Sequence, residues 1–273
     1  MLKQRIITAL VLAILFGGTI LFAEPDWVVA LFAMALFAAS YELQALTIKP
    51  GMPAGLTIAA GIASLFWFSP ESFGIGVNFY QSLTGLLIWV TILGFLVFYR
   101  FSGQWSLATR FFQFILGISL LWICVHGLLL IHLHIQHGSW LLLYLLSLVW
   151  VADIGAYFSG RKFGKYKLAP GISPGKTWEG AAGGIILNLG WMLIVFQISN
   201  GWGMVWWQFL LIGLATSVIS IVGDLYESIL KREAAVKDSG SLLPGHGGVL
   251  DRVDSIIAAT PVFISGLYFV GAV

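Results

Sequence analysis

Apolar residues fall in nine long runs separated by short polar segments. The runs cover residues 6–23, 27–47, 54–69, 78–99, 111–131, 139–160, 178–198, 204–229 and 254–272. A helix needs about 20 mostly apolar residues to cross the hydrocarbon core of a bilayer. The pattern therefore predicts an all-α, polytopic integral membrane protein with about nine transmembrane helices. The 54–69 run is short for a span, and the run that ends at 99 could begin as an interfacial segment near residue 74.

The basic residues indicate which way the helices are oriented. With nine crossings, alternate connections lie on opposite sides of the membrane, and all 14 Lys and Arg residues fall on one side. Cytoplasmic loops carry the excess of Lys and Arg. We therefore expect the N-terminus in the cytoplasm and the C-terminus outside, with the long polar loops 161–177 and 230–253 both cytoplasmic.

The domain organisation follows from these spans. The first run has the basic start of a signal peptide, but its end, Leu21-Phe22-Ala23, is a poor cleavage site, which favours an uncleaved span. No stretch between the runs is long enough for a soluble domain. We expect residues 1–138 to form a dimer contact or scaffold, and residues 139–273 to form the catalytic region with both cytoplasmic loops.

Composition excludes a soluble protein and a nucleic-acid partner. Charged residues make up 10% of the chain, against about 25% in ordinary globular proteins. The formal net charge of +2 is too small for a nucleic-acid-binding surface. The single cysteine, Cys124, lies inside an apolar run and is best explained as a packing residue.

Polar residues concentrate in one block near the C-terminus. Ten of the charged residues fall between Asp224 and Asp254, and charges near a bilayer are costly unless they are paired, solvated or bound to a ligand. The first part lies at a helix end, where Asp224, Glu227, Ser228 and Lys231 share one helical face by their spacing. That face predicts a functional site, although a self-paired polar helix end is the structural alternative.

The block continues through a glycine-rich loop. The loop carries Lys237 and Asp238 and then Pro-Gly-His-Gly-Gly at 244–248, a pattern in which backbone N–H groups can approach an anion closely. Asp251, Arg252, Asp254 and Ser255 follow at the start of the last helix, where acids also act as ordinary caps. Asp224 and Asp251 would then lie on adjacent helix ends, and Mg²⁺ is often held by one or two carboxylates plus substrate phosphates.

Two further polar clusters lie upstream. Asp153, Tyr157 and Arg161 are spaced along one face of a helix, with Asp153 at a depth where an acid needs a partner or a ligand. An internal ion pair of Asp153 with Arg161 is the alternative. The segment 173–180, Ser-Pro-Gly-Lys-Thr-Trp-Glu-Gly, fails the phosphate-loop pattern because its glycine spacing is one residue short. Lys176 could still contact a phosphate.

Together these motifs resemble the phosphatidate cytidylyltransferase (CDP-diacylglycerol synthase) family. The family's C-terminal signature is Ser-x-apolar-Lys-Arg, Lys-Asp, Pro-x-His-Gly-Gly and Asp-Arg-apolar-Asp. It matches at 228–232, 237–238, 244–248 and 251–254. The family elements Ala-Asp-x-Gly-Ala-Tyr-Phe, Gly-Arg and Ser-Pro-x-Lys-Thr match at 152–158, 160–161 and 173–177. The resemblance covers roughly 150–255 and departs at Ile154, where the family would carry Thr or Ser.

The resemblance implies a reaction and its requirements. CTP and phosphatidic acid would give CDP-diacylglycerol and pyrophosphate, on a Mg²⁺-dependent homodimer in the inner membrane of a bacterium, with the site facing the cytoplasm. A second, monovalent cation is left open. The metal ligands would be Asp224 and Asp251. The other expected catalytic residues are Lys231, Arg232, Lys237, Asp238, His246 and Arg252. The expected substrate-binding residues are Asp153, Tyr157, Arg161, Ser173, Lys176, Thr177, Glu227, Ser228, Gly247, Gly248 and Asp254.

Two other functions use the same residues. A CTP-dependent lipid kinase of similar architecture would release a lipid phosphate and CDP instead of a CDP-lipid. A transporter could use mid-span polar residues such as Asp153, but the charged residues here gather at one face of the membrane.

Overall fold

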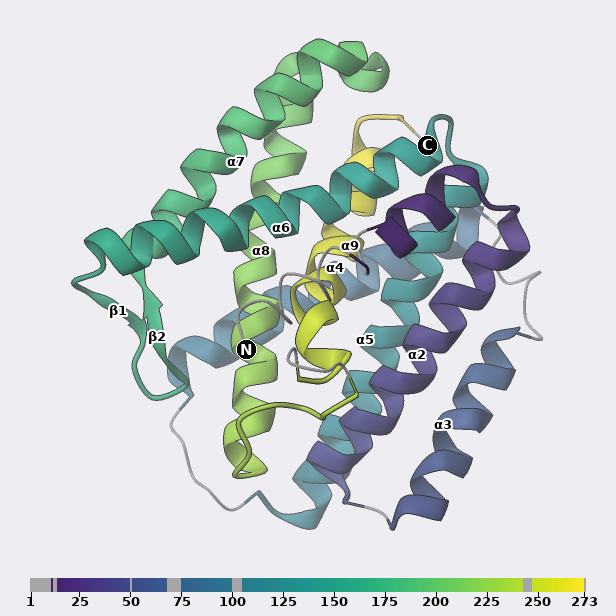
Figure 1. Ribbon diagram of the computed structural model, residues 1–273, viewed down its shortest axis with the longest axis vertical. Helices are drawn as coiled ribbons and strands as arrows, with labels where there is room; N and C mark the ends of the chain where they lie inside the picture. The colour runs from purple at the N-terminus through teal and green to yellow at the C-terminus, as the bar shows by residue number, and fades with distance from the viewer. Residues whose placement is uncertain are drawn as a thin grey trace.

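The chain folds into a bundle of long helices, shown in Figure 1. The computed structural model describes residues 11, 14–49, 51–67, 75–99, 105–242 and 247–272. The helices are α2 (Pro25–Thr47), α3 (Met52–Trp67), α4 (Ile75–Phe98), α5 (Leu107–His134), α6 (Gly138–Phe163), α7 (Trp178–Ser199), α8 (Trp206–Glu233) and α9 (Leu250–Phe269), with a short 3-10 turn, η2 (Asn200–Gly203), between α7 and α8. The all-α prediction is confirmed for these elements.

One predicted loop needs correction. Residues 167–177, expected as part of an irregular cytoplasmic loop, form a two-stranded antiparallel hairpin of β1 (Lys167–Ala169) and β2 (Ser173–Thr177). In Figure 1 it projects from the end of α6 and leads directly into α7. The apolar side chain of Ile172, in the hairpin turn, packs against Leu225 and Ile229 of α8. This contact holds the hairpin against the bundle.

The surface of the bundle is that of a polytopic membrane protein. Six described helices are long and apolar enough to cross a bilayer: α2, α5, α6 and α8, residues 79–98 of α4, and α7 together with η2. Large apolar side chains such as Phe98, Leu107 and Ile198 are 84%, 78% and 80% exposed, an exposure that lipid tolerates and water penalises. α3 has 16 residues, as its short run predicted. The nine-span topology and the orientation stay predictions, and most of the first half of the first run lies outside the described residues.

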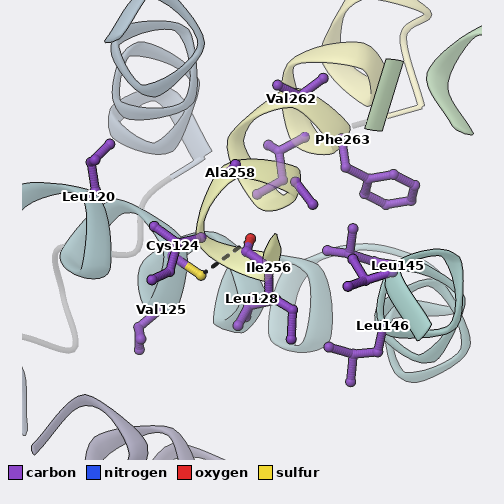
Figure 2. Close-up of a cluster of buried hydrophobic side chains, with 14 of the residues drawn as sticks. Leu120, Cys124, Val125, Leu128, Leu145, Leu146, Ile256, Ala258, Val262 and Phe263 are labelled. Carbon is purple, nitrogen blue, oxygen red and sulfur yellow. Dashed lines mark hydrogen bonds between the residues drawn. The ribbon is translucent and has the colours of Figure 1, made fainter. Parts of the chain in front are cut away.

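The last helix, α9, is the centre of the bundle. It contacts α2, α4, α5, α6 and α8, and every residue from Ser255 to Ser265 is buried. Figure 2 shows part of this core, where Cys124 of α5 packs beside Ile256 with its Sγ 3.7 Å from the Ile256 carbonyl oxygen. The predicted packing role of Cys124 is confirmed.

Glycines allow α6 and α7 to pack closely. The buried positions of α7 are Gly180, Gly184, Asn188 and Met192, one every four residues, which places them on one face of the helix. A Cβ at Gly184 would lie 2.7 Å from the Ala152 carbonyl oxygen of α6. Small residues at such positions allow helix backbones in a membrane to approach each other. The close approach of α6 and α7 therefore depends on the absence of side chains at these positions.

We predict that Gly184→Ala destabilises the protein by about 1–3 kcal/mol, because overpacking forces backbone to move. Gly190→Ala is the matched control on the same helix, since a Cβ there would meet nothing within 4 Å. Chemical denaturation in detergent would compare the two variants. Equal stabilities would contradict the close-packing explanation.

Candidate functional site

A cavity of about 540 Å³ opens between α6, α7, α8 and strand β2. Its polar lining comes from three motifs that are distant in sequence: Asp153, Tyr157 and Arg161 of α6, Lys176 and Thr177 of β2, and Asp224 of α8. Ser255 of α9 also lines it. The structure therefore brings together most of the upstream residues that the sequence selected. Its size lies within the ordinary range for small-molecule sites, about 300–1,000 Å³.

An ion pair lies on the wall of this cavity. The Nζ atom of Lys176 lies 2.6 Å from Oδ2 of Asp224, and both side chains are partly exposed. Thr177 caps α7, because its hydroxyl accepts a hydrogen bond from the Gly180 N–H over 3.1 Å. Lys176 therefore lies beside a helix N-terminus, where the backbone favours negative charge. A cation at the positive end of a helix is a suitable environment for a phosphate.

Asp153, Tyr157 and Arg161 share one face of α6, as their spacing predicted. Arg161 Nη1 donates a hydrogen bond to the Tyr157 hydroxyl over 3.1 Å, and both side chains line the cavity together with Asp153. No ion pair joins Asp153 and Arg161, which are both described residues. Asp153 lies instead within electrostatic reach of Asp224, Lys176 and Arg252. The internal ion pair considered above is therefore wrong.

The second polar cluster joins the end of α8 to the start of α9. Lys231 Nζ lies 2.5 Å from Glu227 Oε2 and 2.7 Å from Asp251 Oδ1. Both carboxylates are mostly buried, with side chains 4% and 6% exposed. The predicted convergence of these two helix ends is confirmed by this bridge. The self-paired alternative is only half correct, because Lys231 pairs with its own helix and with α9.

Asp251 is held by the loop as well as by Lys231. Its Oδ2 atom accepts hydrogen bonds from the backbone N–H groups of Ser239 and Gly248, both at 2.9 Å, and lies 3.0 Å from the Ser239 hydroxyl. These donors fix the carboxylate in a single orientation. Asp251 thus connects the loop, the end of α8 and the first turn of α9.

A line of acids links the two clusters. Asp254, one turn after Asp251, lies within electrostatic reach of Asp224, Glu227 and Asp153. Ser228 donates a weak hydrogen bond to Asp224 Oδ1 at 3.4 Å. Carboxyl groups of α6, α8 and α9 therefore gather near the cavity, where a cation or a cationic group would stabilise their charged forms.

The other expected residues surround these clusters. Arg232 donates from Nε to the Ile172 carbonyl over 3.1 Å and so ties the hairpin turn to α8. Arg252, Lys237 and Asp238 are exposed, and Ser173 is half-buried at the start of β2. Gly247 adopts a φ of 83°, which favours glycine, and Gly248 is buried. His246 lies outside the described residues.

The end of α8 has one further link, to Tyr99, the residue that follows α4. The Tyr99 hydroxyl donates a hydrogen bond to the Glu233 carboxylate. Burial raises the pKa of Tyr99 well above its usual value, and the neighbouring Glu233 raises it further. Tyr99 therefore stays protonated and remains a donor to α8.

Sequence reasoning missed Glu42. This acid lies in α2, is 2% exposed, and accepts hydrogen bonds from the backbone N–H groups of Val249 and Leu250 at 3.1 and 2.8 Å. One signal could have found it, because Glu42 is an ionisable residue within a predicted span, and such residues are functional candidates by default.

The donor chemistry suits a hard cation. Carboxylate oxygens are the protein ligands that Mg²⁺ takes, and Asp224 of α8 and Asp251 of α9 could supply them. In this structure each is paired with a different lysine. Among the described residues, no group of three or more His, Cys, Asp or Glu side chains is arranged around a shared metal position. Substrate phosphates would therefore have to complete any Mg²⁺ site.

Comparison with known proteins identifies relatives over the whole chain. A model of the cytidylyltransferase family matches residues 3–270. Phosphatidate cytidylyltransferase of Haemophilus influenzae is 40% identical over 288 residues, which cover 99% of this chain and 100% of the relative. The enzymes of the same name from Pseudomonas aeruginosa and Bacillus subtilis are 39% and 34% identical, with 99% and 98% of this chain covered and 98% and 97% of theirs.

We predict that Lys231→Met lowers the free energy of unfolding by about 3 kcal/mol, because removing one partner of a buried ion pair leaves unpaired charge. Here Glu227 and Asp251 would both lose their ammonium partner. Lys167→Met, at an exposed position on β1, is the control and should change stability by less than about 0.5 kcal/mol. Denaturation of both variants in detergent would test this; a stable Lys231→Met protein would contradict it.

Proposed function

This chain belongs to the cytidylyltransferase family, and on that premise we propose that it transfers the cytidylyl group of CTP to phosphatidic acid. One observation carries the proposal: residues of the motif segments 152–161 and 173–177, together with Asp224, line a single cavity. Full-length identity to three enzymes named phosphatidate cytidylyltransferase supports it. The products are CDP-diacylglycerol and pyrophosphate.

The reaction requires the protein to neutralise the negative charge of both reactants, and it requires no nucleophilic side chain. A phosphatidate oxygen attacks the α-phosphorus of CTP, a new P–O bond forms, and the bond to the β-phosphate oxygen breaks to release pyrophosphate. The attacking group is already an anion, so no side chain has to activate it. Both reactants are negative, and catalysis consists of positioning them and stabilising their charge.

The basic residues have separate tasks in this proposal. Lys176, at the N-terminus of α7, binds a phosphate in the cavity, and Arg161 with Tyr157 receives the lipid phosphate at the cavity mouth. Lys231, Arg232, Lys237 and Arg252 neutralise the triphosphate from the side of α8 and α9. The apolar lining of Leu168, Ile185 and Ile221 supports a lipid substrate, because acyl chains can lie against it.

Mg²⁺ belongs to the proposal as well. Asp224 and Asp251 would hold it together with CTP phosphates, and a bound Mg²⁺ would neutralise part of the negative charge on those phosphates. Without substrate, Lys176 forms an ion pair with Asp224 and Lys231 forms one with Asp251, and each lysine keeps its aspartate oriented.

The cellular setting completes the proposal. Nine spans with a cytoplasmic N-terminus would place the hairpin and the α8–α9 loop in the cytoplasm, where CTP is available, in the inner membrane of a bacterium. Residues 1–138 would form the scaffold or the contact of a homodimer, and residues 139–273 the catalytic region. Packing of α2, α4 and α5 against α9 supports the scaffold role.

Differential labelling tests the reaction class. Purified protein with Mg²⁺, CTP, phosphatidate and diacylglycerol as a lipid alcohol should transfer label to the organic phase when cytidine or the α-phosphorus is labelled, and none when the γ-phosphorus is labelled. Label transfer only from the γ-phosphorus would indicate the lipid kinase instead. Lipid or ion flux through vesicles without nucleotide would indicate the transporter.

We predict that Asp224→Asn lowers kcat by about 100-fold or more, since a preorganised charged group near the reacting phosphates is worth that much. The variant should still insert into the membrane and elute as the wild type does in detergent. Asp26→Asn, an exposed acid at the start of α2, is the matched control and should keep full activity. Near-normal transfer by Asp224→Asn would contradict the role of this aspartate.

A further inference from the structure

Glu42 connects the N-terminal half of the protein to the catalytic loop. It lies in α2, about two hundred residues before its partners, and is 2% exposed. Its Oε1 atom accepts the Val249 N–H over 3.1 Å, and its Oε2 atom accepts the Leu250 N–H over 2.8 Å. A buried carboxylate in a membrane protein is costly without such donors. These contacts satisfy both of its oxygens.

This contact replaces a local helix cap. The first N–H groups of a helix have no partner within the helix and form its positive end. Val249 occupies the cap position of α9 and provides no side-chain hydrogen bond. Glu42 supplies the acceptors and the negative charge from a different helix. The start of α9, which carries Asp251, is therefore fixed by α2.

Ser239 extends the contact to Asp251. Its hydroxyl lies 2.9 Å from Glu42 Oε2 and 3.0 Å from Asp251 Oδ2, and its backbone N–H donates to Asp251. Asp251 in turn binds Lys231. A continuous set of contacts thus runs from Glu42 through Ser239 and Asp251 to Lys231.

Two glycines leave the space that Glu42 fills. A Cβ at Gly240 would lie 2.4 Å from Glu42 Oε1, and a Cβ at Gly248 would lie 2.3 Å from Oε2. Real Cβ atoms do not approach other atoms so closely, so a side chain at either position would displace the carboxylate or the loop. The backbone on both sides of the 243–246 segment is therefore shaped around Glu42.

We propose that Glu42 is a positioning residue for cytidylyl transfer, which sets the place of Asp251 and Lys231 through the start of α9 and Ser239. The inference rests on the proposed function. The described hydrogen bonds of Glu42 go to Ser239, Val249 and Leu250, none of which lines the cavity, so it acts through the loop and α9.

The test compares Glu42→Gln with Gln44→Leu. The Gln side chain presents an N–H₂ group to one of its former donors and loses at least one hydrogen bond. Gln44 is the matched control, because it is buried on the same helix and its side chain donates a hydrogen bond of 2.6 Å to the Gly55 carbonyl of α3, away from the loop. Gly240→Ala approaches the same contact from the loop side without changing Glu42.

Two measurements are made on each detergent-purified variant. Amide hydrogen exchange, which reports local opening, should be about tenfold faster for peptides covering 247–251 in Glu42→Gln and Gly240→Ala. The kcat of the folded fraction should fall by about 10- to 100-fold, as small misplacements near a site can cause. The KM for CTP should change less than kcat. Gln44→Leu should leave exchange in 247–251 unchanged and kcat within about twofold, since its lost contact lies far from the loop.

The outcomes separate the inference from the proposed function. Unchanged exchange of peptides 247–251 in both Glu42→Gln and Gly240→Ala would overturn the positioning role. Faster exchange of these peptides with a normal kcat would overturn it as well. A fall in activity that matches only the loss of folded protein, with a normal kcat for the rest, would also overturn it. A wild type without cytidylyl transfer would contradict the proposed function, and with it this role in catalysis, whereas the exchange data would still decide whether Glu42 fixes the loop.

Discussion

One ammonium group holds together the two helices on which the site depends. Lys231 lies within 2.7 Å of carboxylates from α8 and α9, in a part of the bundle where an unpaired charge would cost several kcal/mol. Because Lys231 pairs with both Glu227 and Asp251, its ammonium group holds the end of α8 against the start of α9.

The second requirement is that glycines occupy the positions where α7 faces α6. Gly180 and Gly184 bring α7 against α6 and also line the cavity, so the close approach of these helices forms part of its wall. The hairpin then extends from α6 and places Lys176 against Asp224. The cavity therefore combines rigid, glycine-packed walls with charges supplied from three separate segments. Such preorganisation suits a reaction in which two anions must meet.

Several parts of this arrangement could be predicted from the sequence. The spacing of Glu227 and Lys231 predicted a shared helix face, and that of Asp153, Tyr157 and Arg161 predicted another, because helical periodicity is local. The hairpin was not predicted, since Lys167–Ala169 and Ser173–Thr177 lack the alternating apolar pattern of strands and depend on Ile172 packing against α8. Glu42 was also missed, because nothing near it in the sequence indicates that its partners lie on α9.

The sequence by itself determined the membrane class, the positions of most helices and the residues able to handle phosphates, because hydrophobic runs and motif spacing are properties of short segments. Only the tertiary structure decided which charges meet: Lys176 with Asp224, Lys231 with Asp251, and Glu42 with the start of α9. Those pairings depend on how helices pack across the bundle, and side-chain contact between distant segments leaves no periodic pattern within either one.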